Sequence, residues 1–144
     1  MSIKQISVFL ENKPGKLEEM TALLAEKGID MRAISLAETK DFGIARLIAD
    51  DVLSAVNVLR DGDFIAKLTP VLAYAVPNEP GGLHKLLTFF RQEDVNIEYM
   101  YSSLGGSASA RAYMIFRVAD TERAEAALTS RGLVPLTQEE ISLA

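Results

Sequence analysis

The sequence contains no cysteine and no tryptophan, and it has a single histidine among its 144 residues. Without cysteine the chain forms no disulfide, offers no thiolate nucleophile and cannot bind a metal through sulfur. No apolar run approaches the roughly 20 residues that a membrane-spanning helix needs. These absences favour a cytoplasmic protein that uses no cofactor and no metal and that has no membrane partner.

Basic residues are also fewer than acidic residues. Fifteen Lys and Arg stand against 20 Asp and Glu, which gives a formal net charge of −5 at pH 7, and an acidic surface repels a phosphate backbone. Tyr99, Tyr101 and Tyr113 alternate along predicted strands, as base-stacking aromatics do in some RNA-binding sheets. The basic residues that accompany such aromatics are missing. We therefore expect no nucleic-acid partner, and we assign Tyr99 and Tyr101 to a small-ligand pocket or to an interface between units.

Known catalytic motifs are missing as well. His84 is the sole imidazole and has no suitably spaced carboxylates around it, so we assign it to the surface or to an interface. Neither Gly-x-Ser-x-Gly nor His-Glu-x-x-His occurs. Gly105-Gly106 lacks the surroundings of a nucleotide-binding loop and is predicted to form a hairpin turn. The sequence therefore predicts a protein that is not an enzyme.

What the chain does contain is an internal repeat. The segment Asn12-Lys13-Pro14-Gly15-Lys16-Leu17 recurs 66 residues later as Asn78-Glu79-Pro80-Gly81-Gly82-Leu83, with four identities in six positions. Further along, Asp51 and Asp120 each precede an apolar helical pattern. No linker rich in Gly or Ser separates the copies, and Pro70 is the only punctuation between them. We infer a duplication, with one unit at residues 1–69 and a second at 70–144.

Each copy reads as strand, helix, strand, strand, helix, strand. Asn12 is expected to cap the first helix and Gly28 to end it. The strands are predicted at about Ile6–Leu10, Ile29–Glu38, Phe42–Ala49, from Phe64, Val71–Val76, Val95–Ser102, Ala112–Val118 and Leu133–Leu136. A βαββαβ unit of about 70 residues is the ferredoxin-like arrangement, with two helices on one face of an antiparallel sheet. The predicted fold class is α+β, built from two tandem units of this kind.

A strand ending in Asn-x-Pro-Gly-x-Leu, followed by a helix that closes with Gly-Ile-Asp and a second strand, resembles the ACT domain. With two copies, the whole chain resembles the stand-alone tandem ACT proteins. The resemblance implies a regulatory protein that binds a small molecule, usually an amino acid, where two ACT units meet. It also implies a homodimer and a partner enzyme of amino-acid metabolism. The ligand contacts are expected from the loop between the first strand and the first helix, and from the start of the second strand.

Transferred to this chain, the resemblance assigns ligand binding to Asn12, Pro14, Gly15, Lys16, Leu17, Asp30 and Met31 in the first copy, and to Asn78, Pro80, Gly81, Gly82, Leu83, Asn96, Ile97 and Tyr99 in the second. Elementary physics supports the two loops, because a helix N-terminus attracts a carboxylate and glycine lets a ligand approach the backbone. The second loop, with two adjacent glycines, is expected to be the stronger site. Two alternatives remain open: a structural interaction module without a ligand and, less favoured, an enzyme of unrecognised type.

Overall fold

The computed structural model describes residues 2–38, 40–103 and 111–143. Contacts divide the chain into two compact units. The N-terminal unit is Lys4–Thr69, and the C-terminal unit is Met1–Ile3 together with Pro70–Ala144. That residues 1–69 and 70–144 are two domains stays a prediction. The hairpin turn expected at Gly105-Gly106 lies outside the described residues.

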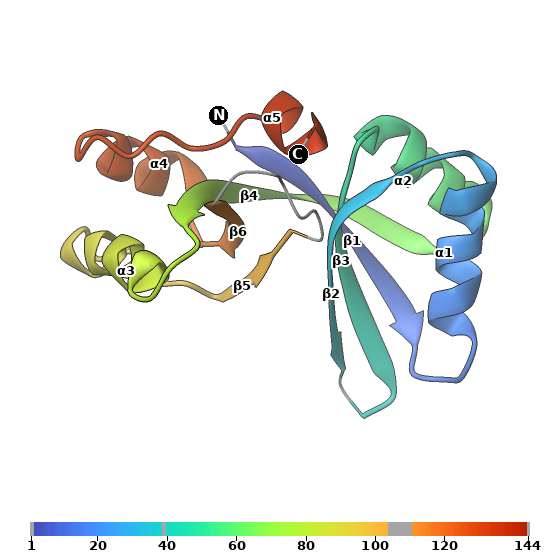
Figure 1. Ribbon diagram of the computed structural model, residues 1–144. Helices are drawn as coiled ribbons and strands as arrows, with labels where there is room; N and C mark the ends of the chain where they lie inside the picture. Colours follow the sequence, from blue (N-terminus) through green and yellow to red (C-terminus); the bar gives the residue numbers. More distant parts are fainter. Residues whose placement is uncertain (1, 39, 104–110, 144) are drawn as a thin grey trace. The chain divides into compact units, whose positions relative to one another are not determined.

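The N-terminal unit is an antiparallel sheet with two helices packed on one face (Figure 1). Its elements are β1 (Ile3–Glu11), α1 (Lys16–Glu26), β2 (Met31–Glu38), β3 (Phe42–Ala49), α2 (Val52–Asp61) and the first part of β4 (Ile65–Pro77). The strands lie in the order β2-β3-β1-β4, and β3 is antiparallel to both of its neighbours. The core of the unit lies between this face of the sheet and the two helices.

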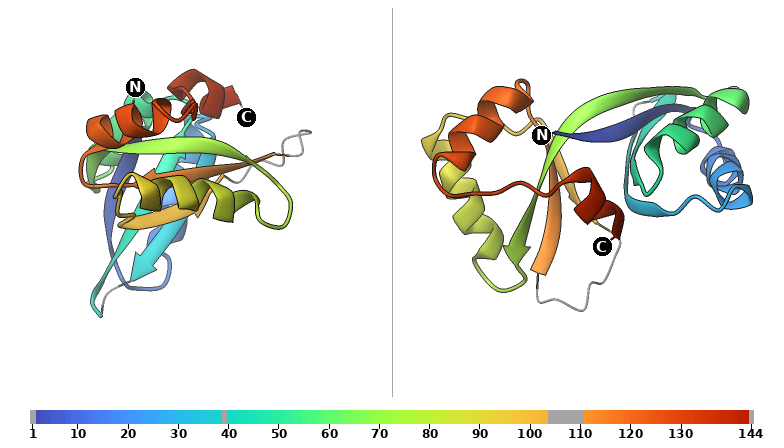
Figure 2. Two further views of the ribbon diagram at one scale, coloured as in Figure 1. Left: turned by 90° about the vertical axis from the view of Figure 1, so that its left-hand side faces the viewer. Right: turned by 90° about the horizontal axis from the view of Figure 1, so that it is seen from above.

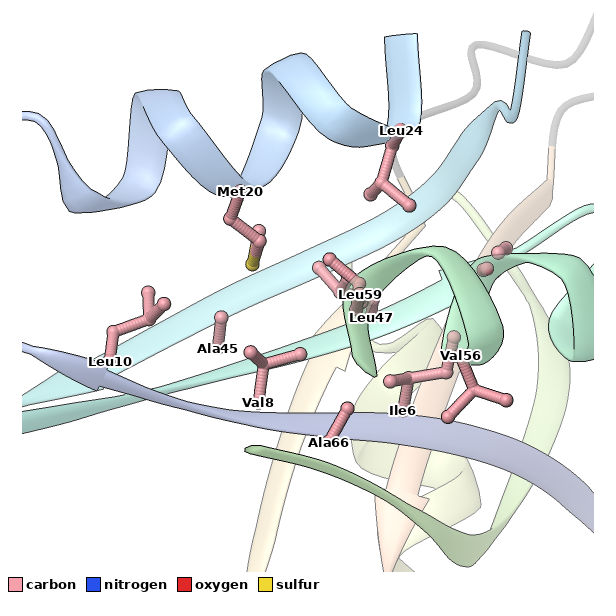
Figure 3. Packing of buried hydrophobic residues seen from close by; sticks show 12 residues of the cluster. Ile6, Val8, Leu10, Met20, Leu24, Ala45, Leu47, Val56, Leu59 and Ala66 are labelled. Carbon is pink, nitrogen blue, oxygen red and sulfur yellow. The ribbon is translucent and has the colours of Figure 1, made fainter. Parts of the chain in front are cut away.

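The core of the N-terminal unit follows from the alternation of apolar residues along β1. Ile6, Val8 and Leu10 point to the same face of the sheet because successive strand side chains alternate. They are buried against Met20 of α1 and Leu59 of α2 (Figure 3). The expected strand and helix of this segment are therefore confirmed.

Local capping explains where α2 and α4 begin and where α1 ends. The Oδ1 atoms of Asp51 and Asp120 accept hydrogen bonds of 3.1 Å from backbone amides in the first turns of α2 and α4, which confirms both expected caps. Gly28 adopts φ +67° immediately after α1. The amide of Ile29 then donates to the carbonyl of Leu24 at 3.0 Å, which closes the helix as expected.

The C-terminal unit is built on the second part of β4. Its further elements are α3 (Gly82–Gln92), β5 (Tyr99–Ser102), β6 (Arg111–Arg117), α4 (Thr121–Thr129) and α5 (Gln138–Leu143). The strand order is β4-β6-β5, with antiparallel pairs, and α3 and α4 lie on the same side of these strands (Figure 2). Tyr74, Phe90 and Phe116 form an aromatic cluster in the core, with ring centroids 4.8 to 6.4 Å apart. The predicted α+β class of two tandem ferredoxin-like units is confirmed.

The strand at the junction of the copies differs from the prediction. Two strands were expected, from Phe64 and over Val71–Val76, but β4 runs without a break from Ile65 to Pro77. Pro70 lies outside the ladder with β6, which begins at Leu72, so its missing amide removes no hydrogen bond from that pair. The carbonyl of Pro70 instead accepts a hydrogen bond of 2.8 Å from Arg117 Nη1.

The end of the chain also departs from the prediction. No strand forms at Leu133–Leu136, where a single backbone bond of 2.7 Å joins the amide of Leu136 to the carbonyl of Ala73. Pro135 has no amide with which to continue a ladder. Thr137 and Glu140 then form a reciprocal capping box, each backbone amide donating to the other's side chain at 3.1 Å, and this starts the unpredicted helix α5. Likewise, β5 begins at Tyr99 rather than Val95.

The phenol of Tyr74 yields a prediction about stability. The side chain is 2% exposed, and its hydroxyl has no hydrogen-bond partner in the part of the chain that the structure describes. An unsatisfied buried donor costs about 1–3 kcal/mol. We therefore expect Tyr74→Phe to raise the free energy of unfolding by about 1–2 kcal/mol in urea denaturation. A loss of stability would contradict this and would show that the hydroxyl is bonded.

The same variant has a pH signature. Burial raises the pKa of Tyr74 in the folded protein, and the nearby charge of Glu125 raises it further. In the unfolded chain the phenol ionises near pH 10. The unfolded state therefore loses this proton first, and the stability of the wild type should fall as the pH rises above 10. The Phe variant should lose less stability over that range.

Candidate functional site

The loop between β1 and α1 is formed by Asn12–Gly15 and ends in an unusual backbone conformation. Gly15 adopts φ +87°, which is in the left-handed region that favours glycine. A Cβ atom at this position would meet nothing within 4 Å, so the space beside the loop is open. No side chain caps α1.

The expected cap by Asn12 is wrong. Its Nδ2 atom donates instead to Glu38 Oε2 at 3.4 Å. The physical reason is the length of the turn, because α1 begins only at Lys16 and Gly15 occupies the capping position. Pro14 accordingly lies in the loop and not in the first turn of the helix.

The loop between β4 and α3, formed by Asn78–Gly81, repeats this geometry. Gly81 adopts φ +85°, has open space where a Cβ would lie, and precedes a helix that no side chain caps. The first amides of α1 and α3, those of Lys16 and Gly82, donate to the backbone carbonyls of Lys13 and Glu79 at 3.4 and 3.1 Å, and among the described residues no side-chain acceptor competes for the amides that follow. Such a helix start is suited to hold an anion.

Gly82 has a different role from the one expected. It is buried, and a Cβ on it would overlap the backbone carbonyl oxygen of Pro77. The absent side chain therefore lets α3 pack on the end of β4. The argument that two adjacent glycines make the second loop the barer and stronger site is wrong on this point.

Two cavities meet at the first loop. The smaller, here called the loop pocket, has a volume of about 80 Å³ and is lined by Leu10, Glu11, Asn12, Lys13, Lys16, Leu17, Leu36, Glu38 and Gly43. The larger, here called the aromatic cavity, has a volume of about 310 Å³ and is lined by Phe9, Leu10, Glu11, Lys16, Glu19, Phe42, Gly62, Asp63, Phe64 and Ile65. The structure thus brings the predicted residues Asn12, Lys16 and Leu17 together in one pocket. Leu10, Glu11 and Lys16 belong to both cavities.

Charges of both signs lie where the cavities meet. Lys13 Nζ is 2.9 Å from Glu11 Oε2, and Lys16 Nζ is 4.0 Å from Glu11 Oε1 and 3.4 Å from Glu19 Oε2. The hydrogen bond from Lys13 lowers the pKa of Glu11, and the charges of Lys13 and Lys16 lower it further. Glu11 is therefore a carboxylate at neutral pH. An ionised carboxylate beside two ammonium groups can bind both ends of a zwitterion.

The starts of the second strands do not join this loop within a unit. Glu38 pairs with Gly43, and Gly43 pairs with Leu10, so the end of β2 lies beside the end of β1 (Figure 1). Met31, at the start of β2, pairs with Ala49 at the far end of the sheet. The reason is topological, because β1 and β2 run in the same direction and α1 returns the chain to the starting end.

The predicted contacts of Asp30 are local in the structure. Its Oδ2 is 2.6 Å from Arg32 Nη1, and its backbone amide donates to Asp50 Oδ1 at 3.0 Å. Asp30 and Met31 therefore lie away from Asn12 in the same unit. The first half of the predicted residue set is divided between two ends of the sheet.

The C-terminal unit divides its residues in the same way. Pro77, just before the loop, pairs with Arg111 at one end of β6, whereas Tyr99 pairs with Arg117 at the other end. Within this unit Tyr99 therefore lies at the opposite end of the sheet from the loop at Asn78. Asn96 and Ile97 precede β5 and share the position of Tyr99 at the far end.

With this geometry established, comparison with known families is informative. A family model described as an ACT domain pair matches residues 1–143. The chain belongs to the ACT domain pair family. No curated protein matches it.

Two solved structures place this ACT domain pair among its relatives. It is similar to protein BT0572 from Bacteroides thetaiotaomicron, with 36% sequence identity, a TM-score of 0.91 and coverage of 100% of this chain and 98% of the other. It also shares its fold with the regulatory subunit of aspartate kinase from Thermus thermophilus, solved in a ligand-free form. There the identity is 21%, the TM-score 0.66, and the coverage 92% of both chains.

Within residues 2–38, 40–103 and 111–143, no group of three or more Asp, Glu or His side chains is placed to hold a metal ion. None of the helices in these ranges is both long enough and apolar enough to cross a membrane.

Two adjacent glycines give a matched test of the loop geometry. Gly82→Ala should lower the free energy of unfolding by about 3 kcal/mol, because the added Cβ overlaps the Pro77 carbonyl. Gly81→Ala should cost only about 1–2 kcal/mol, because it meets open space and is disfavoured by its positive φ alone. Urea denaturation of both variants measures the difference. Equal losses would contradict the packing role of Gly82.

Proposed function

We propose that this ACT domain pair is a non-catalytic regulatory protein that binds a free amino acid at the loop between β1 and α1. The observation that carries the proposal is a contrast between helices. Asp51 and Asp120 cap α2 and α4, whereas α1 and α3 begin after left-handed glycines with no side-chain cap and with open space beside them. An external carboxylate is the acceptor that such a helix start lacks.

The charges around the loop pocket supply the rest of the recognition. In the proposed complex the ligand carboxylate lies at the first turn of α1 near Lys16, and the ammonium group lies near Glu11 and Glu38. These side chains come from three elements that the sheet register brings together. Asn12 is already hydrogen-bonded to Glu38 and fixes one wall of the pocket.

The biological setting of the proposal comes from the relatives. The structure from Thermus thermophilus is described as the regulatory subunit of aspartate kinase, and its likeness to this chain supports the fold. We extend this to a cytoplasmic homodimer that transmits ligand occupancy to an enzyme of amino-acid metabolism. In such a dimer the residues at the starts of β2 and β5, Asp30, Met31, Asn96, Ile97 and Tyr99, would complete the partner chain's loop sites.

A thermal-shift screen with the twenty L-amino acids tests the function. A ligand at about 100 times its Kd adds about 2.7 kcal/mol to the free energy of unfolding if it binds only the folded state. At least one amino acid at millimolar concentration should therefore raise the melting temperature by several degrees. If none does, the alternative of a structural interaction module without a ligand is favoured.

The position of the site is tested by two lysines on one helix. Lys16 lies in the first turn of α1 and lines both cavities, whereas Lys27 is exposed at the opposite end of the helix. Lys16→Gln should weaken the binding of the amino acid found in the screen by roughly 10-fold or more, because a charged hydrogen bond is lost. Lys27→Gln removes the same charge and should leave the affinity unchanged. Calorimetry that shows equal effects would place the site elsewhere.

A further inference from the structure

The aromatic cavity is the feature of the N-terminal unit that the proposed binding mode leaves unused. A carboxylate and an ammonium group at the loop pocket account for Lys16, Glu11 and Glu38, but they need no apolar surface. The loop pocket itself, at about 80 Å³, is too small for a large side chain. The aromatic cavity shares Glu11 and Lys16 with it and adds about 310 Å³, within the usual size of small-molecule sites.

Exposed apolar side chains of this unit gather at the two cavities. Within the described part of Lys4–Thr69, five large hydrophobic residues are exposed, and four of them line one cavity or the other. Phe9, Phe42 and Ile65 line the aromatic cavity and are 38%, 57% and 69% exposed, respectively. Leu36 lines the loop pocket, and only Leu53 lies apart. Exposed apolar side chains that gather at one place on a surface are typical of a binding site, because they contribute little to the packing of the core.

The charges of the aromatic cavity restrict which side chain it accepts. Its acidic residues Glu11, Glu19 and Asp63 outnumber its single cation, Lys16, so an acidic side chain is repelled. The same acidic excess attracts a basic side chain, so the argument against a basic side chain rests on the cation already present beside Phe9. Lys67 Nζ already lies 5.8 Å from the centroid of the Phe9 ring and occupies the cation position over that face. An uncharged apolar side chain meets neither obstacle.

We propose that the amino acid bound at the loop of β1 and α1 has a large apolar or aromatic side chain, which lies in the aromatic cavity against Phe9, Phe42 and Ile65. This inference rests on the proposed function. Leu10, Glu11 and Lys16 line both cavities, so the ligand's side chain can pass from the loop pocket into the aromatic cavity at these residues. The aromatic cavity then determines which amino acid the loop site selects. The rival occupant of the same apolar surface is a second copy of the chain.

Calorimetry with five probes tests the selectivity: L-phenylalanine, L-leucine, L-alanine, L-aspartate and L-lysine. Phenylalanine and leucine should bind at least about 10-fold more tightly than alanine, because they bury more apolar surface. Aspartate and lysine should bind more weakly than phenylalanine. If alanine, aspartate or lysine binds as tightly as phenylalanine, the proposed selectivity is overturned while amino-acid binding stands. If none of the twenty amino acids binds, it is the proposed function that fails.

A matched pair of variants tests the location. Phe42→Ala removes an exposed ring of the aromatic cavity, and Leu53→Ala removes an exposed side chain of similar accessibility on α2. Phe42→Ala should weaken phenylalanine binding about 5- to 10-fold and leave alanine binding unchanged, whereas Leu53→Ala should change neither. An equal loss for phenylalanine and alanine would overturn the proposal. The proposal would also be overturned if Phe42→Ala lowered the molecular mass measured by light scattering but left the preference for phenylalanine over alanine unchanged. That result would assign the surface to contacts with a second copy of the chain.

Discussion

The turn from strand to helix at Gly15 and Gly81 is the constraint on which both units depend. In each copy a short loop must redirect the chain from the end of a strand onto a helix that covers the same sheet, and a left-handed residue completes the turn. Glycine adopts this conformation readily, but it has no side chain with which to cap the helix that follows. The glycine that completes the turn therefore leaves the start of the following helix without a side-chain cap, at one edge of each unit. The fold and the candidate anion site have the same origin.

Much of the fold could be predicted because its signals are local. Asp51 and Asp120 act within one helical turn, and the alternation along β1 needs only neighbouring residues. One failure concerns pairing with a distant strand. Whether Pro70 interrupts β4 depends on where β6 begins to pair, which no window around the proline contains. The capping box of Thr137 and Glu140 is a local sequence pattern that indicates α5. It was not used, because the repeat predicted a strand in that region.

The candidate site was less predictable, because its walls come from different strands. Asn12 and Lys16 were found through the repeated motif, whereas Glu38 and Phe42 join them only through the register of β3 with β1 and β2. Tyr99 was assigned to the same set as the loop residues of the second copy, yet within its unit it lies at the other end of the sheet. A motif gives the order of its residues along the chain, but the topology decides which end of the sheet each residue occupies.

The unbroken course of β4 affects how this protein can be altered or inherited. The boundary between the copies falls inside β4, so in the described part of the chain a strand joins them and not a structureless linker of the kind that proteases cut most readily. Either half expressed alone would begin or end in the middle of a hydrogen-bonded element and would carry a frayed strand terminus into solution. Recombination that exchanges one half for a foreign module would meet the same obstacle. The two copies arose by duplication, but because they share one strand we expect them to be inherited together.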